Sequence, residues 1–109
     1  MIIKMVEVKI NAGICGFITT IYAESEDLQM ATLSIKTDCP NYKVLEDNPI
    51  EVDGFVECFS KLGEGGLYSL CKTYCPHAAC PVAAGMIKAV EVACGLALPK
   101  TASIEVSRK

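Results

Sequence analysis

The sequence predicts a single α+β domain, in which an antiparallel sheet carries helices on one face. Two observations favour this class. Three segments with strand-like alternation lie within the first 37 of the 109 residues, and a long, almost entirely apolar helical segment lies in the last third. A chain of this length buries one core of ordinary size, and no low-complexity linker divides it. We therefore treat residues 1–109 as one domain.

Three segments alternate apolar and polar side chains, as strands with one buried face do. They are Ile2–Ile10, Phe17–Ala23 and Met30–Thr37. The connections Asn11–Gly16 and Glu24–Asp27 are short and consist mostly of glycine or polar residues. Consecutive strands joined by short connections usually pair in antiparallel fashion. The sequence thus predicts a three-stranded antiparallel meander whose apolar face is covered by helices.

The middle of the chain predicts short helices separated by breaks. Asn41–Glu46 is expected to form a short helix. Pro40 precedes it, because proline fits the first helical turn, and Pro49 follows its end. Ile50–Lys61 is expected to form the next helix, since its apolar residues recur on one helical face. The glycine-rich segment Leu62–Gly66 is expected to be a loop, and Leu67–Ala79 to contain a helical turn.

The strongest helical signal is Val82–Leu98, which Pro81 opens and Pro99 ends. Only two charged residues interrupt it, and a helix that is apolar nearly all round is normally buried on most sides. We expect it to be the central helix that lies across the sheet, with a homo-oligomer interface as the alternative. Thr101–Val106 alternates again and is a candidate fourth strand at the edge of the sheet.

Composition excludes several function classes. The formal net charge is −3, with dispersed charges and no basic stripe, so nucleic acid is not expected as a partner. No segment is long and apolar enough to predict a membrane span, and the N-terminus lacks a signal-peptide core. The expected location is the cytoplasm. There the seven cysteines, an odd number, point to metal binding or thiol chemistry rather than to disulfides.

Three cysteines fall where predicted elements begin or turn. Cys15 lies in the first turn, Cys39 follows the third strand, and Cys80 precedes the last helix. If the sheet and helices pack as expected, all three lie at the same end of the sheet. Cys39 and Cys80 would each stand at a helix N-terminus, where backbone N–H groups favour the thiolate. Thiolates are the form that binds metals and attacks sulfur electrophiles, so these three residues are the candidate ligands.

A second group of cysteines surrounds the only histidine. The spacing Cys71-x3-Cys75-x-His77-x2-Cys80 is dense in ligand types, but it matches neither common zinc spacings nor ferredoxin motifs. Cys75 and His77 are candidates for a fourth ligand, and the role of Cys71 stays open. Two further cysteines lie among apolar residues of helical segments and are expected to pack in the core: Cys58 and Cys94.

The order and context of Cys15, Cys39 and Cys80 resemble those of the U-type iron–sulfur cluster assembly scaffolds. Cys15-Gly16 corresponds to a Cys-Gly turn before the second strand, Cys39 to a cysteine after the third strand, and Ile87-Lys88-Ala89 follows Cys80 as in that family. The sequence is divergent. Phe17 stands where the family has an aspartate, and a Leu-Pro-Pro-Val-Lys chaperone-docking segment is absent. The resemblance implies a small α+β fold that holds a nascent cluster on three cysteines.

Three function classes follow from these observations. The first is a protein that binds an iron–sulfur cluster or Zn²⁺ through Cys15, Cys39 and Cys80, and that stores the cluster or passes it on. Its expected partners are a sulfur-donor protein or a cluster-acceptor protein. The second is metal-free sulfur transfer or redox chemistry at an activated Cys80 or Cys39. The third is a structural or interaction domain with incidental cysteines. A turnover enzyme is not expected, because phosphate-loop and nucleophile-elbow motifs are absent and the chain has one histidine.

Overall fold

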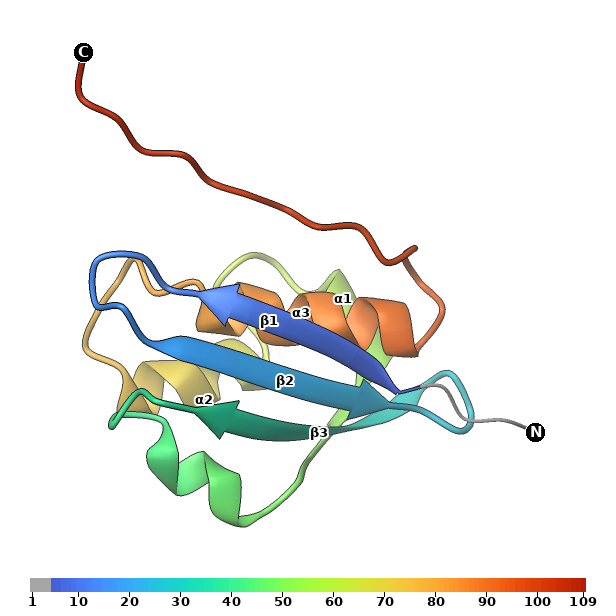
Figure 1. Cartoon of the computed structure of the whole chain (residues 1–109). Helices are drawn as coiled ribbons and strands as arrows, with labels where there is room; N and C mark the ends of the chain where they lie inside the picture. The colour runs from blue at the N-terminus through green and yellow to red at the C-terminus, as the bar shows by residue number, and fades with distance from the viewer. Residues whose placement is uncertain (1–4) are drawn as a thin grey trace.

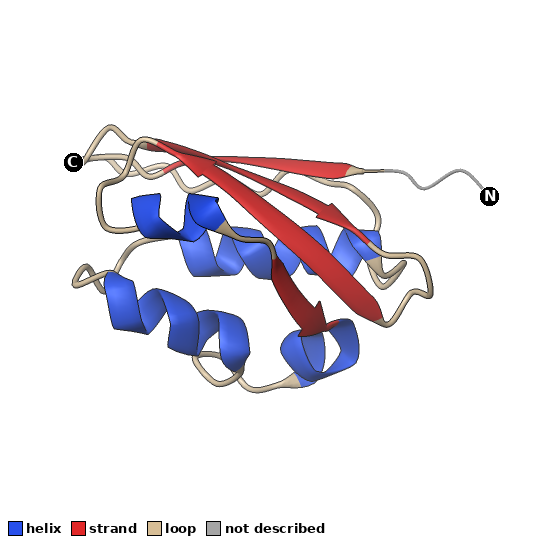
Figure 2. Cartoon of the chain, turned by 90° about the horizontal axis from the view of Figure 1, so that it is seen from below, coloured by secondary structure: helices blue, strands red, loops and turns tan. Residues whose placement is uncertain are grey.

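A computed structural model describes residues 5–109 as a four-stranded antiparallel sheet with three α-helices on one face. The strands follow the order β1-β2-β3-β4. Figure 1 looks onto the sheet with the helices behind it, and Figure 2 shows the two layers from below. The predicted α+β class is therefore confirmed, with the last helix on the sheet. Within residues 5–109, no helix is long and apolar enough to cross a membrane.

The first three strands lie close to where alternation predicts them. They are β1 (Val6–Asn11), β2 (Ile18–Glu24) and β3 (Met30–Thr37). The predicted first strand, Ile2–Ile10, begins in residues 1–4, which lie outside the described part of the chain. Alternate residues of β2 and β3 are buried against the helices, as period-two burial requires. The interior side of the sheet is formed by small and branched side chains: Ile10, Ile21, Ala23, Ala31, Leu33 and Ile35.

The fourth strand differs from the sequence prediction. β4 (Ile50–Asp53) pairs with β3, whereas Ile50–Lys61 was expected to be helical throughout. The helix α1 (Gly54–Phe59) begins only after Asp53, whose carboxylate accepts the N–H groups of Phe55 and Val56 at 3.0 and 3.2 Å. Asp53 is thus the N-cap that separates strand from helix. The helical prediction failed here because four residues show too little periodicity to distinguish a strand from a helical turn.

Two helical segments precede the long helix. The predicted helix Asn41–Glu46 is a 3₁₀-helix, η1 (Lys43–Asp47), and the predicted helical turn in Leu67–Ala79 is a nine-residue helix, α2 (Gly66–Tyr74). The buried Glu57 carboxylate caps α2 by accepting the N–H groups of its first two residues at 2.9 and 2.5 Å. The sequence does not predict this cap, because Glu57 belongs to another helix, α1.

The helix α3 (Val82–Ala93) is the central helix that the sequence predicts. It packs on β1, β2 and β3, and Met86, Ala89 and Val90 have no exposed surface. The helix ends five residues before the predicted Leu98, because the chain turns at Gly95 with φ +73°. Residues 98–109 then run in an extended path without regular structure, so the strand predicted at Thr101–Val106 is not formed.

Candidate functional site

The cysteine-bearing segments gather at one end of the sheet, as the sequence predicts. The β1–β2 loop, the segment after β3 and the segment between α2 and α3 lie together at the left of Figure 1. Cys15 is exposed in the first of these segments, Cys39 is buried in the second, and Cys75 and Cys80 are half-buried in the third. The contacts among them decide which of these thiols can act together.

A tight turn brings Cys75 and Cys80 together. The Cys75 N–H closes α2 by donating to the carbonyl of Cys71 at 2.8 Å. Pro76 then prevents the helix from continuing, since it holds the preceding residue in extended backbone. The Cys80 N–H donates to the carbonyl of His77 at 3.1 Å, which folds the segment back toward α3. The side chains of Cys75 and Cys80 lie close enough to shift one another's pKa, so the two thiols form a pair.

Tyr42 completes the site from the other side. The turn after β3, in which the Tyr42 N–H donates to the Cys39 carbonyl at 3.2 Å, directs this residue into the core. The ring is 1% exposed, and the hydroxyl lies 3.5 Å from the sulfur of Cys80. It also interacts with Cys75. Burial, followed by these thiol neighbours, raises the pKa of Tyr42 well above its ordinary value, so the hydroxyl keeps its proton and serves as a donor.

The two thiols of the pair differ in acidity. Burial by itself would raise the pKa of Cys75, but interactions with Tyr42, the His77 backbone and Cys80 more than offset it, and the pKa falls below its ordinary value. The Cys75 thiol donates to the His77 carbonyl at 3.8 Å. At Cys80 burial dominates and the neighbouring Cys75 charge adds to it, so the pKa of Cys80 is raised despite hydrogen bonds from Tyr42 and Val82. Cys75 is therefore the more acidic thiol of the pair, and Cys80 is the less acidic one.

A third cysteine borders the pair and, like Cys80, has a raised pKa. Cys71 is buried on α2, and its thiol lies 3.7 Å from the Met86 sulfur. Burial raises the pKa of Cys71 to about 11, so at neutral pH it is a protonated packing residue. Cys94 is buried, as expected for a core residue, whereas Cys58 is only half-buried.

The ligand set predicted from sequence is not assembled in this arrangement. Within residues 5–109, no group of three or more histidine, cysteine, aspartate or glutamate side chains is positioned to hold a metal ion. Of Cys15, Cys39 and Cys80, only Cys80 belongs to the thiol pair. Cys39 also lies outside a helix N-terminus, contrary to the prediction, because η1 begins four residues later at Lys43. His77 is exposed and contributes backbone groups to the turn.

The sequence pointed to Cys80 as a ligand beside Cys15 and Cys39, and to Cys75 as a candidate fourth ligand, but it did not predict their pairing and it missed Tyr42. Both cysteines lie in a short segment with two prolines and a histidine. Tyr42 carries no such signal, since it lies 38 residues before Cys80 and no motif connects them.

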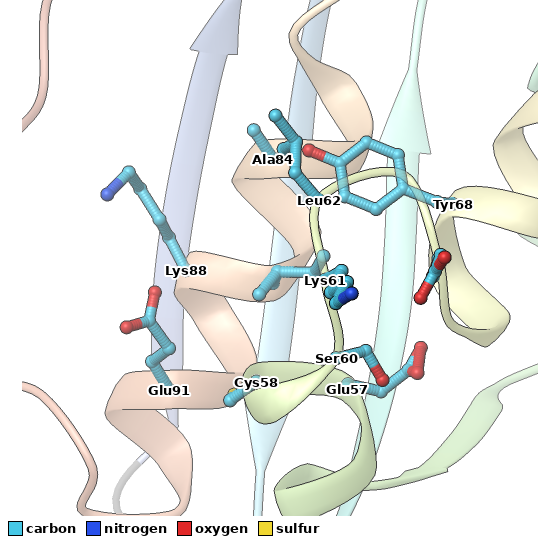
Figure 3. A pocket seen from close by; sticks show the side chains of 11 residues that line it. Glu57, Cys58, Ser60, Lys61, Leu62, Tyr68, Ala84, Lys88 and Glu91 are labelled. Atoms are coloured by element: carbon cyan, nitrogen blue, oxygen red, sulfur yellow. The ribbon is translucent and has the colours of Figure 1, made fainter.

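A separate pocket lies between the helices. Its volume is about 300 Å³, and it opens where α1, the segment after it, α2 and α3 meet. Figure 3 shows Tyr68, Lys88 and Glu91 around it, with the Cys58 side chain at its base. Burial raises the pKa of Cys58 to about 11, so this thiol is unreactive at neutral pH. The pocket therefore holds no activated nucleophile, and the thiol pair is the better candidate site.

The chain matches no curated protein and no solved structure. A family model described as a family of unknown function, DUF6951, matches residues 6–106. The matched range contains every strand and helix of the fold, Tyr42 and both members of the thiol pair. The chain therefore belongs to this family.

Proposed function

We propose that this protein carries out thiol–disulfide exchange, with Cys75 and Cys80 as a redox-active pair. The observation that carries the proposal is the cluster of these two thiols with the Tyr42 hydroxyl, which lies 3.5 Å from the Cys80 sulfur. Thiol–disulfide exchange needs one thiolate to attack and a second thiol to complete the reaction. A pair with one lowered and one raised pKa suits these two roles.

The reaction follows from the acidity of each group. The Cys75 thiolate attacks one sulfur of a partner disulfide, a new S–S bond forms, and the other partner sulfur leaves as a thiolate. Cys80 then gives up its proton to water and attacks the Cys75 sulfur, which releases the second partner thiolate. The pair ends as a Cys75–Cys80 disulfide, oxidised by two electrons, and the partner disulfide is reduced to two thiols.

The surroundings of the pair support this division of roles. The Tyr42 hydroxyl stays protonated and stabilises the attacking thiolate by donating to it. Pro76 and His77 are exposed beside Cys75, so a partner can approach that sulfur. Cys71 does not compete, since its pKa of about 11 keeps it protonated.

The proposal implies a reducing compartment and a disulfide-bearing partner. All seven cysteines are free thiols in the structure, and in the cytoplasm they would be kept reduced. The partner is a protein or a small molecule with an accessible disulfide. No turnover of a further substrate is required, so the protein acts as a carrier of reducing equivalents rather than as a metabolic enzyme.

The test is to equilibrate the reduced protein with mixtures of oxidised and reduced glutathione, block free thiols by alkylation, and map the disulfides by mass spectrometry. We expect one dominant disulfide, Cys75–Cys80, that forms and breaks reversibly. Cys75→Ser and Cys80→Ser should each abolish it. Cys71→Ser is the matched control, because it removes a neighbouring thiol and should leave the Cys75–Cys80 disulfide intact. Random pairing among the seven cysteines, or no protein disulfide at any ratio, would overturn the proposal.

Cluster binding is the second candidate, favoured by the gathering at one end of the sheet of the three segments that carry Cys15, Cys39 and Cys80. Under this proposal loops move to bring the three thiolates around an iron–sulfur cluster or Zn²⁺, with Cys75 or His77 as a fourth ligand. The partners would be a sulfur donor and a cluster acceptor. Anaerobic purification with elemental analysis tests it: metal that is lost in Cys39→Ala supports cluster binding, and a metal-free, colourless protein rules it out.

A further inference from the structure

Two features of the chain have no role in the thiol site and complement one another. The first is the outer edge of β1, which is the first strand of the sheet. The second is the C-terminal segment, residues 98–109, which leaves the domain without regular structure. An open sheet edge and an unpaired strand-like segment are the two halves of a β-pairing.

The outer edge of β1 presents a defined row of backbone groups. The Ala12 N–H donates to the Phe17 carbonyl at 3.3 Å, and this bond fixes which pairs in the β1–β2 register are hydrogen-bonded. Hydrogen-bonded and non-hydrogen-bonded residue pairs alternate along an antiparallel ladder. The β1 residues whose backbone groups bond to β2 are therefore Val6, Val8 and Ile10. The N–H and C=O groups of the intervening residues point outward: Glu7, Lys9 and Asn11. Within residues 5–109, no strand pairs with this edge.

The C-terminal segment has the pattern of an edge strand. Apolar Ile104 and Val106 alternate with polar Ser103, Glu105 and Ser107. Ile104 is 84% exposed and Val106 is 91% exposed, so neither is buried by its own domain. Figure 1 shows the segment starting near the β1 side of the sheet and diverging from the domain toward the C-terminus. Its apolar face is therefore free for another molecule.

We propose that residues 101–106 of one copy add as a strand to the outer edge of β1 in a second copy, and that the exchange is reciprocal in a symmetric homodimer. The second copy is the occupant because each chain carries both an open edge and a strand that projects away from its own domain. Reciprocal pairing satisfies both edges at once and leaves no open edge for further growth at β1.

The side-chain pattern suits this pairing. In a register that places Glu105 opposite Lys9, Ile104 and Val106 lie on the helix side of the sheet, next to Ile10 and the half-buried Val8. Glu105 then lies on the solvent side, where Lys9 offers an opposite charge. One strand register therefore buries Ile104 and Val106 and leaves the Glu105 carboxylate exposed to water.

The test is the mass of the full chain in solution, measured by light scattering or sedimentation. The wild-type protein should have about twice the 11.7 kDa mass of the chain. The double variant Ile104→Asp/Val106→Asp should be monomeric, because it places charges on the face that is buried in the pairing. The control Ser103→Asp/Ser107→Asp adds the same charge on the opposite face and should remain dimeric.

The edge of β1 is tested by removing one outward N–H. Lys9→Pro removes a donor that β2 does not use, so the sheet is retained and the dimer should be lost, whereas Lys9→Ala should remain dimeric. Mixing Lys9→Pro with Ile104→Asp/Val106→Asp should restore a heterodimer, since one intact edge meets one intact segment. A wild-type monomer at millimolar concentration, including one whose own segment folds onto β1, overturns the proposal. So does a dimer that persists in Ile104→Asp/Val106→Asp.

Discussion

Tyr42 places a hydroxyl among the thiols of Cys71, Cys75 and Cys80. Its hydroxyl is held in the core by the turn after β3, reaches Cys80 at 3.5 Å and interacts with Cys75. A thiolate in a half-buried site needs such a donor, because burial raises the pKa of a thiol, as it does at Cys58. Acidity here is a property of position rather than of residue type.

Tyr42→Phe should therefore raise the pKa of Cys75 while leaving the core packed. We expect alkylation of Cys75 by iodoacetamide at neutral pH to slow by roughly 2- to 10-fold, the range that the loss of one hydrogen bond predicts. The pH at which Cys75 becomes reactive should shift upward. Mass spectrometry of the alkylated peptides measures both quantities.

The control for this prediction is the alkylation of Cys58, which lies outside the Tyr42 cluster and has a pKa of about 11. Its reaction should be slow in both proteins and should not change. If Cys75 reacts equally in the wild type and in Tyr42→Phe, the hydroxyl does not stabilise its thiolate. The proposed division of roles between Cys75 and Cys80 would then lose its physical basis.

At the scale of elements, alternation and helical periodicity predicted most of the fold because each is a local property. β2, β3 and α3 are long enough for their patterns to be unambiguous. β4 was missed because it has four residues, and the true start of α1 depends on the cap at Asp53. The length of α2 also depends on a contact across the chain, since Glu57 of α1 caps its N-terminus.

The contact between α3 and β1 yields a second prediction. Gly85 faces β1, and a Cβ at this position would meet Ile10, with the Cγ1 atom at 2.7 Å. Gly→Ala normally stabilises a helix interior by up to about 1 kcal/mol. Here the overlap should reverse the sign, and Gly85→Ala should lower the free energy of unfolding by about 1–3 kcal/mol. Urea denaturation measures it.

Ile10→Val provides the matched compensation, because it removes the Cδ1 methyl that the new Cβ would meet. The double variant Gly85→Ala/Ile10→Val should recover part of the stability lost in Gly85→Ala. Simple additivity of the two single effects would show that the two sites are not in contact.

For the whole molecule, three carboxylates connect stability to pH. Hydrogen bonds lower the pKa of Asp53, chiefly from Gln29 and then Val56, and that of Asp27, from the backbone of Gln29 and Met30. The Thr37 N–H lowers the pKa of Glu46. A carboxyl group whose pKa is lower in the folded state stabilises the fold at pH values above its ordinary pKa, which is 3.8 for aspartate and 4.5 for glutamate. This stabilisation is lost as the pH falls through the pKa of the folded state.

The urea concentration at the midpoint of unfolding should therefore decrease as the pH is lowered from 5 to 2.5. Asp53→Asn should make this decrease smaller. Asp47→Asn is the charge-matched control, because it removes one exposed carboxylate at the end of η1. An equal change in both variants would mean that net charge, rather than the hydrogen bonds of Asp53, controls the acid response.

The fold class, the three long strands, the central helix and the end of the sheet shared by the segments of Cys15, Cys39 and Cys80 could all be predicted from the sequence. Each depends on periodicity, on turn residues or on the direction of consecutive strands, which are readable along the chain. Which thiols meet could not be predicted in this way. The pairing of Cys75 with Cys80 beside Tyr42 depends on how distant segments pack. Packing also sets burial and hydrogen bonding, which determine the acidity of a thiol and have no signature in the spacing of the residues.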